Sequence, residues 1–432
     1  MKPLAYVIFF VTLFFFYPPA YAQPEKPMPE GTDPASLKLM QGFPVPPDKQ
    51  ITAADFFNFP NSRWTFHHLR EFRPTSNIWR GRGDPSVLEI AVKDLGKIEF
   101  EDDKGGMTTI DQWQKNTFTD AMMVLHQGKI VYERYYHTMR SELPHLMFSV
   151  TKSFTGLLAT QLIYEGKLDP NVLVSQYVPE LIHTAWGDAT VQQTLDMTTA
   201  VAFTEVYNDP TSDIFGYAYA CGMVPLPADY TGPKGVTDFL KTLKKKGEHG
   251  DGFMYRTVNS EVIGWILRRV TGKRFAELMS ERIWQPMGAE EDAYVWVDMF
   301  GAELMGAGLN ATLRDLARAC EMLRLGGKYN GRQIIAGEII KEIRKGADRE
   351  KFKKGNTARK GYSYHNQWWI THNDNGAYEA WGVHGQTLHI NPGSEMVIVK
   401  LSSNPVASNK ATHDLNTRAF SAIANALSES GG

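Results

Sequence analysis

The feature of this sequence that most constrains its fold is the order of its strand-like and helix-like patterns along the chain. Strand patterns lie near both ends of the chain, and helix patterns fill the middle. An early β-hairpin is predicted where the runs 120–126 and 129–136 flank the dipeptide Gln127-Gly128. The late strands that we predict are 364–371, 378–390 and 396–401. Strands this far apart in the chain share one sheet only if the segment between them forms an inserted unit.

Apolar residues spaced three to four apart predict the helices. These cover 149–165, 191–197, 236–245, 259–270 and 313–325, with a shorter one over 275–283 and a closing one from about 413 to 427. We therefore expect an α+β fold for residues 106–432: an antiparallel sheet flanked by helices and formed from both chain ends, with a mainly helical lobe at about 167–325 inserted in it. A cleft between the two lobes is the expected place for chemistry.

The N-terminus has the pattern of a secretory signal peptide. Lys2 precedes an apolar run over 4–17, and Ala20-Tyr21-Ala22 has the small residues that signal peptidases require. We expect residues 1–22 to be removed before Gln23, which predicts a periplasmic or secreted protein. The alternative is an uncleaved anchor, although the run is shorter than the about 20 residues that a membrane-spanning helix needs.

The segment after this peptide is rich in proline and polar residues. Residues 23–105 are predicted to be a linker that wraps the surface of the domain. No later stretch is long and apolar enough to predict a stable membrane span. The only cysteines, Cys221 and Cys320, are expected to be buried free thiols, with a single disulfide as the alternative.

Charge and motifs exclude several partners. The 46 Lys and Arg residues nearly balance 48 Asp and Glu residues, so no surplus of charge attracts nucleic acid. The 12 His residues are scattered without metal-ligand spacing, and no glycine-rich phosphate loop is present. We expect no metal and no cofactor, and a small molecule as the partner; the oligomeric state stays open.

Ser149 and Lys152 form the first candidate catalytic pair. Residues three apart on a helix share a face, which brings the Lys152 ammonium beside the Ser149 hydroxyl. The start of a helix also stabilises negative charge and depresses the pKa of a lysine nearby. The alternative is that Ser149 is an ordinary helix N-cap and Lys152 a solvated residue of the first turn.

The surroundings of this pair resemble one superfamily. Residues 148–156 (Phe-Ser-Val-Thr-Lys-Ser-Phe-Thr-Gly), the upstream hairpin, Leu168-Asp169-Pro170 and 195–199 (Leu-Asp-Met-Thr-Thr) are similar to serine β-lactamases and penicillin-binding proteins. The resemblance spans about residues 110–430. It is strongest to the class C-like branch, which includes esterases, D-amino-acid amidases and 6-aminohexanoate-dimer hydrolases. It implies a β-lactamase-like fold and a cofactor-free hydrolase with Ser149 as nucleophile and Lys152 beside it.

The resemblance also implies that Tyr255 carries protons. In the family a tyrosine lies beside the Ser–Lys pair, and we expect Lys152 to lower its pKa. The common family pattern is Tyr-x-Asn, but Thr257 occupies the third position here. We expect Asn259, two residues later, to be the N-cap of the following helix.

The strand that bears Lys-Thr-Gly in β-lactamases corresponds to 380–382 (Ala-Trp-Gly) here. The resemblance implies an oxyanion hole made of the Ser149 and Val383 N–H groups. It also implies that Tyr207, on a mobile loop, closes over the substrate. The substrate-binding residues that we predict are Tyr207, Trp381, Gly382 and His384, although His384 has an equally plausible structural role. Core positions are expected for Trp368 and Trp369.

These features predict an exported serine hydrolase that cleaves an amide or an ester through an acyl-enzyme on Ser149, similar to the 6-aminohexanoate-dimer hydrolases. One alternative is a β-lactamase or D,D-peptidase, against which the missing Lys of Lys-Thr-Gly argues. A second alternative is a sensor or binding protein that is acylated without turnover. A single sequence does not identify the substrate, because one fold serves many substrates.

Overall fold

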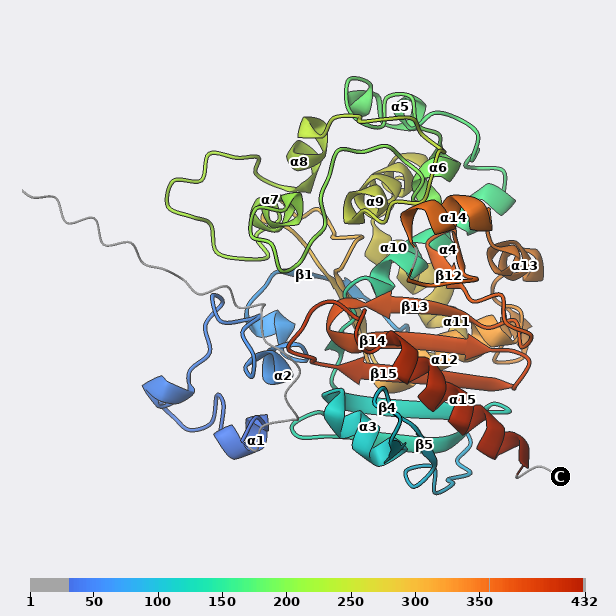
Figure 1. The fold of residues 1–432 in the computed structure, drawn as a ribbon. Coiled ribbons are helices and arrows are strands. Elements are labelled where there is room, and N and C mark those ends of the chain that lie inside the picture. Colours follow the sequence, from blue (N-terminus) through green and yellow to red (C-terminus); the bar gives the residue numbers. More distant parts are fainter. Residues whose placement is uncertain (1–30, 357, 430–432) are drawn as a thin grey trace, which may run out of the picture.

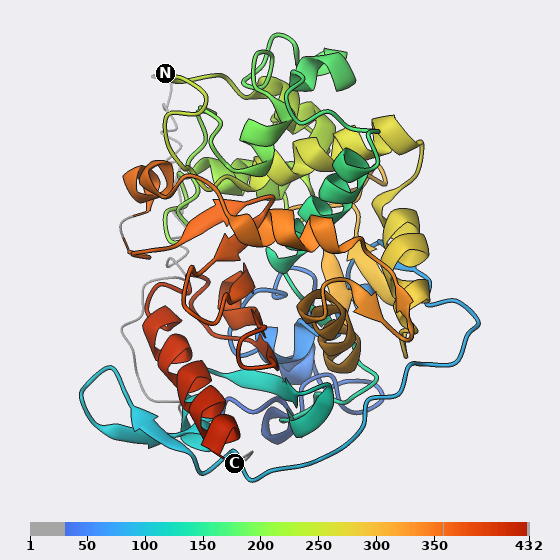
Figure 2. The same cartoon turned by 90° about the vertical axis from the view of Figure 1, so that its right-hand side faces the viewer.

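The computed structural model describes residues 31–356 and 358–429, so the predicted signal peptide lies outside the described residues. Figures 1 and 2 show a sheet with helices on both faces and a helical lobe above it. The longer helices are α3 (Ile110–Asn116), α4 (Val150–Tyr164), α7 (Asp213–Ala220), α8 (Val236–Thr242), α9 (Thr257–Thr271), α12 (Leu313–Arg324), α13 (Gly337–Lys345), α14 (Arg349–Gly355) and α15 (His413–Glu429). The shorter ones are α1 (Pro34–Leu37), α2 (Ser62–Thr65), α5 (Val174–Tyr177), α6 (Val191–Leu195), α10 (Phe275–Met279) and α11 (Gln285–Met287).

The main sheet has seven strands in the order β11-β12-β13-β14-β15-β4-β5, and every neighbouring pair is antiparallel. Its strands are β4 (Thr119–His126), β5 (Lys129–Tyr135), β11 (Ser363–His365), β12 (Trp368–Ile370), β13 (Tyr378–Gly382), β14 (Gln386–Asn391) and β15 (Met396–Ser402). Because β15 pairs with β4, the two ends of the chain share one sheet, as the α+β prediction required. The β4–β5 turn has left-handed φ values at Gln127 (51°) and Gly128 (77°), which suit a two-residue hairpin.

Alternate residues of the central strands face two different cores. Met122 and Val124 of β4 pack with Trp113 of α3 and Phe420 of α15 on one face. Met123 belongs to the large core on the other face, where α12 packs against β4, β14 and β15. Helix α12, which we expected at the end of the inserted lobe, instead covers the sheet with its buried face.

Helix α4 lies between the sheet and the helical lobe, and its residues 150–162 are all buried. A helix buried on every side needs small residues where the backbone of a neighbour approaches. A Cβ added at Gly156 would lie 2.0 Å from the carbonyl oxygen of Asn366, so only glycine fits there. This close contact fixes α4, and the residues at its N-terminus, against the turn between β11 and β12.

Two of the predicted late strands are in fact hairpins. The run 364–371 turns at Asn366 and Gln367, which have φ values of 46° and 66°. The run 378–390 turns at 383–385, where His384 has a φ of 63°. Neither turn was predicted, because neither contains the usual Asn-Gly or Asp-Gly pair.

The N-terminal segment contributes to the core as well as to the surface. Phe56, Phe66, Leu69 and Ile78 belong to the main hydrophobic core. Strand β1 (Thr75–Ile78) pairs with β7 (Ala293–Trp296), and a second sheet has the order β1-β7-β8-β6. The other strands of this sheet are β6 (His145–Leu146) and β8 (Leu309–Ala311); the small ribbons are β2 (Glu99–Glu101) with β3 (Met107–Thr109) and β9 (Lys328–Tyr329) with β10 (Arg332–Gln333).

Cys221 and Cys320 are both free and buried, which confirms the expectation of two thiols. Among the described helices, none combines the length and the apolar character that crossing a membrane requires.

Candidate active site

Ser149 and Lys152 are in contact at the N-terminus of α4. Ser149 precedes the helix and makes no side-chain capping hydrogen bond, so it is not an ordinary N-cap. Lys152 Nζ lies 2.8 Å from Ser149 Oγ and 2.6 Å from the carbonyl oxygen of Gly306. Lys152 is 1% exposed, so the alternative of a solvated lysine is wrong.

Burial lowers the pKa of Lys152 to about 8, although Glu205 and Glu261 act in the opposite direction. Glu261 is itself buried and accepts hydrogen bonds from the Gly306 N–H at 2.7 Å and from the Tyr217 hydroxyl at 2.6 Å. It therefore holds the loop whose carbonyl binds Lys152. At this pKa, neutral pH leaves a useful fraction of Lys152 uncharged and able to accept a proton.

Tyr255 lies beside both Lys152 and Ser149. Its ring centroid is 5.2 Å from Lys152 Nζ, and the ring stacks on Trp369 at 5.7 Å. Burial and the charge of Glu205 raise the pKa of Tyr255, while a hydrogen bond with Ser149 lowers it only in part. The expectation that Lys152 lowers the pKa of this tyrosine is therefore wrong. Tyr255 is a neutral phenol, and Lys152 is the group that loses its proton more easily.

Asn259 is not the N-cap that we expected. Helix α9 begins at Thr257, so Asn259 lies inside its first turn and is fully buried. Its Oδ1 accepts hydrogen bonds from Trp186 Nε1 at 2.9 Å and Thr199 Oγ1 at 2.8 Å. The side chain thus ties the 195–199 motif to α9.

Glu205 is a residue of the site that the sequence analysis did not find. Its carboxylate accepts hydrogen bonds from the Thr257 N–H and hydroxyl, both at 2.6 Å, and from the Tyr207 hydroxyl at 2.6 Å. A carboxylate at a helix N-terminus is stabilised by the free N–H groups and the helix dipole. Glu205 and Thr257 are 52 residues apart, and no local pattern connects them.

The C-terminal end of β13 approaches the segment before Ser149. A Cβ added at Gly382 would lie 2.3 Å from the carbonyl oxygen of Met147, so only glycine allows β13 this close. Ser149 and Val383 line one pocket, and neither N–H takes part in a loop or turn hydrogen bond with the described backbone. Gln386 donates to the Val383 carbonyl at 3.3 Å and accepts from the Ser402 N–H at 3.0 Å, which fixes this turn.

His384 is uncharged. Burial lowers its pKa to about 4, and its Nδ1 lies 2.7 Å from the carbonyl oxygen of Asn404. A carbonyl only accepts, so Nδ1 carries the proton and Nε2 has none. The ring also packs on Phe66 and Phe148, which is a structural role. The structural role considered for His384 is thus present, and any contact that its Nε2 makes with a substrate is limited to accepting a hydrogen bond.

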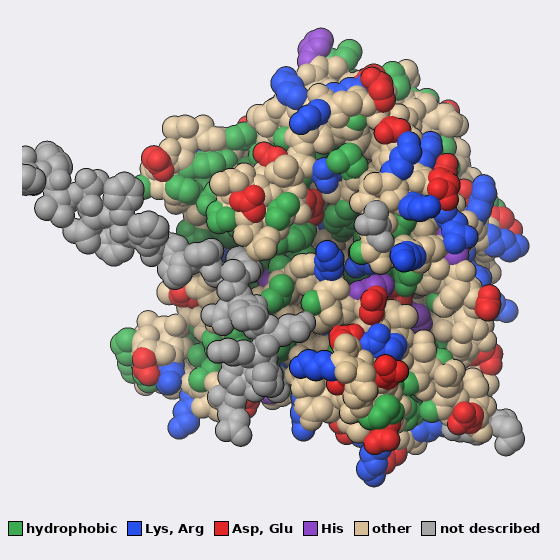
Figure 3. All heavy atoms as spheres, in the orientation of Figure 1, with side chains coloured by type: hydrophobic (Ala, Val, Ile, Leu, Met, Phe, Trp, Pro, Cys, Tyr) green, Lys and Arg blue, Asp and Glu red, His purple; other side chains and the backbone are tan. Residues whose placement is uncertain are grey.

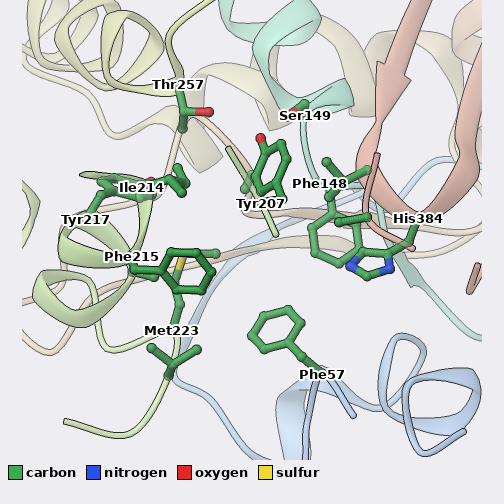
Figure 4. Close-up of a pocket in the computed structure, with 15 residues that line it drawn as sticks. Phe57, Phe148, Ser149, Tyr207, Ile214, Phe215, Tyr217, Met223, Thr257 and His384 are labelled. Atoms are coloured by element: carbon green, nitrogen blue, oxygen red, sulfur yellow. The ribbon is translucent and has the colours of Figure 1, made fainter. Parts of the chain in front are cut away.

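The remaining predicted residues separate into two groups. Tyr207 lines the same pocket as Ser149 (Figure 4), whereas Trp381 and Gly382 are not among the described residues that line it. Trp381 stacks on Trp369 at 4.4 Å and lies under Arg359. Trp368 is fully buried in the core and Trp369 is 7% exposed, as expected for core positions.

The pocket beside Ser149 encloses about 720 Å³, including its opening to solvent. Figure 4 shows Ser149, Tyr207 and Thr257 on one side, Phe215 and Met223 on a second, Phe148 with His384 on a third, and Phe57 opposite Ser149. Figure 3 shows hydrophobic side chains gathered in the hollow between the lobes. A concave, mostly apolar site with a few polar groups is the usual form of a small-molecule site.

A two-lobed α+β fold with a Ser–Lys pair at the N-terminus of a buried helix defines the class of the β-lactamase-like serine hydrolases. The family model described as Beta-lactamase matches residues 104–421, and the chain belongs to this family.

Two relatives are similar to this chain over most of its length. The 6-aminohexanoate-dimer hydrolase of Paenarthrobacter ureafaciens is 33% identical over 374 residues, which cover 85% of this chain and 92% of the relative. A solved structure from Bacillus anthracis, proposed to be a 6-aminohexanoate-dimer hydrolase, has a TM-score of 0.82 and 34% identity, covering 89% of this chain and 99% of its own. A family VIII carboxylesterase, at 18% identity and a TM-score of 0.53 over 71% of this chain and 91% of its own, shares the fold.

Proposed function

We propose that this hydrolase cleaves an amide or ester bond through an acyl-enzyme on Ser149. The observation that carries the proposal is the contact between Lys152 Nζ and Ser149 Oγ at 2.8 Å, at a lysine whose pKa is lowered to about 8. Neutral Lys152 takes the Ser149 proton as Oγ attacks the carbonyl carbon. The Ser149 and Val383 N–H groups then stabilise the oxyanion.

The Tyr255 hydroxyl gives its proton to the departing amine or alcohol and is reprotonated from the Lys152 ammonium. Water then attacks the acyl carbon; one of its protons restores the Ser149 hydroxyl as the bond between Oγ and the acyl group breaks, and the carboxylic acid leaves. This assignment is supported by the position of Tyr255 beside both Lys152 and Ser149. The relative from Paenarthrobacter ureafaciens, named for the hydrolysis of a 6-aminohexanoate dimer, supports testing linear amides alongside esters.

The decisive experiment measures hydrolysis of p-nitrophenyl butyrate by the protein from Gln23 onward, with Ser149→Ala and Tyr255→Phe variants. We expect Ser149→Ala to lower kcat by a factor on the order of 10⁴ or more, and to leave the far-UV spectrum and melting temperature unchanged. The exposed Ser141→Ala variant is the matched control. A folded Ser149→Ala protein that keeps most of the activity would exclude this mechanism. A stoichiometric burst without steady-state turnover would favour the acylated sensor.

We also propose that the protein is exported and that its first 22 residues are removed. The charged start, the apolar run over 4–17 and Ala20-Tyr21-Ala22 support this. Expression of the full gene in a Gram-negative host, followed by fractionation and intact-mass measurement, tests it. The expected result is a periplasmic protein that begins at Gln23; an unprocessed protein in the membrane fraction would support the anchor instead.

A further inference from the structure

The pocket beside Ser149 has an unusual composition for a site in a chain with 94 charged residues, 46 basic and 48 acidic. None of the described residues that line it is Lys, Arg, Asp or Glu. Its only histidine, His384, is neutral because burial lowers its pKa to about 4. A charged group placed in this pocket would lose its hydration and meet no opposite charge on the lining.

Most polar atoms of the lining are already engaged. The Tyr207 hydroxyl donates to Glu205 and the Tyr217 hydroxyl donates to Glu261, each at 2.6 Å. The Thr257 hydroxyl also donates to Glu205. These side chains therefore offer the pocket ring faces and methyl groups, while Ser149 Oγ and His384 Nε2 remain for a ligand.

The pocket lies on the acyl side of the proposed nucleophile. A leaving group must lie next to its proton donor, Tyr255, because the proton moves between them in the transition state. Tyr255 is not among the described residues that line this pocket; it packs instead in the cluster with Trp369 and Tyr364. The portion of the substrate that enters the pocket is therefore the part that stays on Ser149 as the acyl group.

One wall comes from a segment that precedes the family match. Phe57 lies in the N-terminal segment, outside residues 104–421, and faces Ser149 across the pocket (Figure 4). Its ring is held by contacts with Phe56 at 5.0 Å and with Trp296 at 6.5 Å. An aromatic wall opposite the nucleophile limits the length and the polarity of the acyl chain.

From these observations we infer that the enzyme selects substrates with an uncharged, apolar acyl group of medium length, and that Phe57 is a specificity-determining residue for that group. The inference rests on the proposed role of Ser149. Burial of aliphatic carbons against this lining favours binding. A terminal carboxylate or ammonium in the same place is strongly disfavoured, because an unpaired buried charge is costly.

The test uses p-nitrophenyl esters that share one leaving group: the acetate, the hexanoate and the adipate monoester, whose six-carbon chain ends in a carboxylate. We expect kcat/KM for the hexanoate to exceed that for the adipate monoester at least about 100-fold. Phe57→Ala should reduce the ratio of hexanoate to acetate kcat/KM about tenfold. The control is Phe43→Ala, since Phe43 is fully exposed in the same segment; it should leave that ratio unchanged.

A gain-of-function variant separates pocket chemistry from folding. Val224 is half-buried at the pocket, so Val224→Lys can present an ammonium to the acyl chain. We expect it to raise the adipate-to-hexanoate ratio of kcat/KM at least tenfold. Equal kcat/KM of the wild type for the hexanoate and the adipate monoester would overturn this inference. So would a Phe57→Ala variant with the wild-type ratio of hexanoate to acetate kcat/KM. In either case, turnover that depends on Ser149 would leave the proposed function intact. If Ser149→Ala kept the activity, both would fall.

Discussion

Lys152 is the residue on which the proposed chemistry depends, and its pKa results from opposing effects. Burial disfavours the ammonium, while the carboxylates of Glu205 and Glu261 favour it. The result, about 8, leaves the lysine able to exchange protons near neutral pH. Because Lys152 must be neutral to accept the Ser149 proton, activity should increase as the pH rises through this value.

We therefore predict that kcat/KM for p-nitrophenyl butyrate rises with pH, with a midpoint near 8. Below the midpoint the rate should fall about tenfold per pH unit, since the neutral fraction of Lys152 does so. Stopped-flow or plate-reader rates between pH 6 and 10, corrected for spontaneous ester hydrolysis, give the profile. A profile that is flat from pH 7 to 9 would remove Lys152 as the base.

Glu205 offers a second test of Lys152 as the base, because its charge acts on Lys152 whereas its hydrogen bonds act on α9. Glu205→Gln keeps an oxygen that can accept from Thr257 but removes the negative charge. Since that charge raises the pKa of Lys152, its loss should move the midpoint of the kcat/KM profile to lower pH. Glu248→Gln, at an exposed side chain, is the control and should keep the wild-type midpoint. A purely structural role for Glu205 would lower the rate without moving the midpoint.

The site residues that could be predicted from the sequence are those that belong to a short motif. Ser149 and Lys152 are three apart on one helix, so helix geometry alone places them together. Glu205 and Glu261 reach the same site from a loop and from a different helix. Their role depends on tertiary packing, and no spacing in the sequence reveals it. Burial and the charge of Glu205 raise the pKa of Tyr255. The expected decrease considered only the charge of Lys152, and the sequence does not show the other two effects.

At the scale of elements, the site depends on how closely β13 approaches the N-terminus of α4. Gly382 permits this approach because it has no Cβ; a Cβ at this position would lie 2.3 Å from the carbonyl oxygen of Met147. The approach brings Val383 to the same pocket as Ser149. The preceding residue of β13 is the large Trp381. Glycine is required at 382 because any side chain would collide with the Met147 carbonyl.

We predict that Gly382→Ala lowers kcat/KM about 100-fold by displacing the Val383 N–H, a loss typical of small misplacements of catalytic groups. KM should change much less than kcat, since oxyanion contacts form mainly in the transition state. Steady-state kinetics and a melting curve check this. Gly83→Ala is the control, because a Cβ at Gly83 meets nothing within 4 Å. Wild-type kcat in a folded Gly382→Ala protein would contradict the assignment.

The elements themselves were predictable where their apolar period was regular. Helix α4, the β4–β5 hairpin and α15 lie close to the expected ranges. The late strands were merged because the turns between them lack the Asn-Gly or Asp-Gly pair that marks a hairpin in a sequence. Only the backbone shows the left-handed residues Asn366, Gln367 and His384 that divide them.

At the scale of the whole molecule, a buried polar cluster connects segments from both ends of the chain. Asp120 of β4 lies 3.5 Å from Arg63 of α2 and 3.3 Å from His145 of β6. It also accepts a hydrogen bond at 3.0 Å from Ser403, just after β15. Burial alone would raise the pKa of Asp120, but the hydrogen bond from His145 and the charge of Arg63 hold it below its usual value. The N-terminal segment is therefore fixed to the sheet by charge as well as by its core phenylalanines.

We predict that Asp120→Asn lowers the free energy of unfolding by about 3–5 kcal/mol, because it removes the buried carboxylate that the Arg63 guanidinium faces. Urea unfolding followed by tryptophan fluorescence measures this, with exposed Asp209→Asn as the matched control. The folded-state pKa of Asp120 is lowered, so its contribution is present above the unfolded value of about 3.9 and is lost as the pH falls through the folded value. The difference between wild type and variant should thus be constant from pH 6 to 8 and shrink only below about pH 4. Identical urea midpoints at pH 7 would show that the cluster does not hold the two chain ends together.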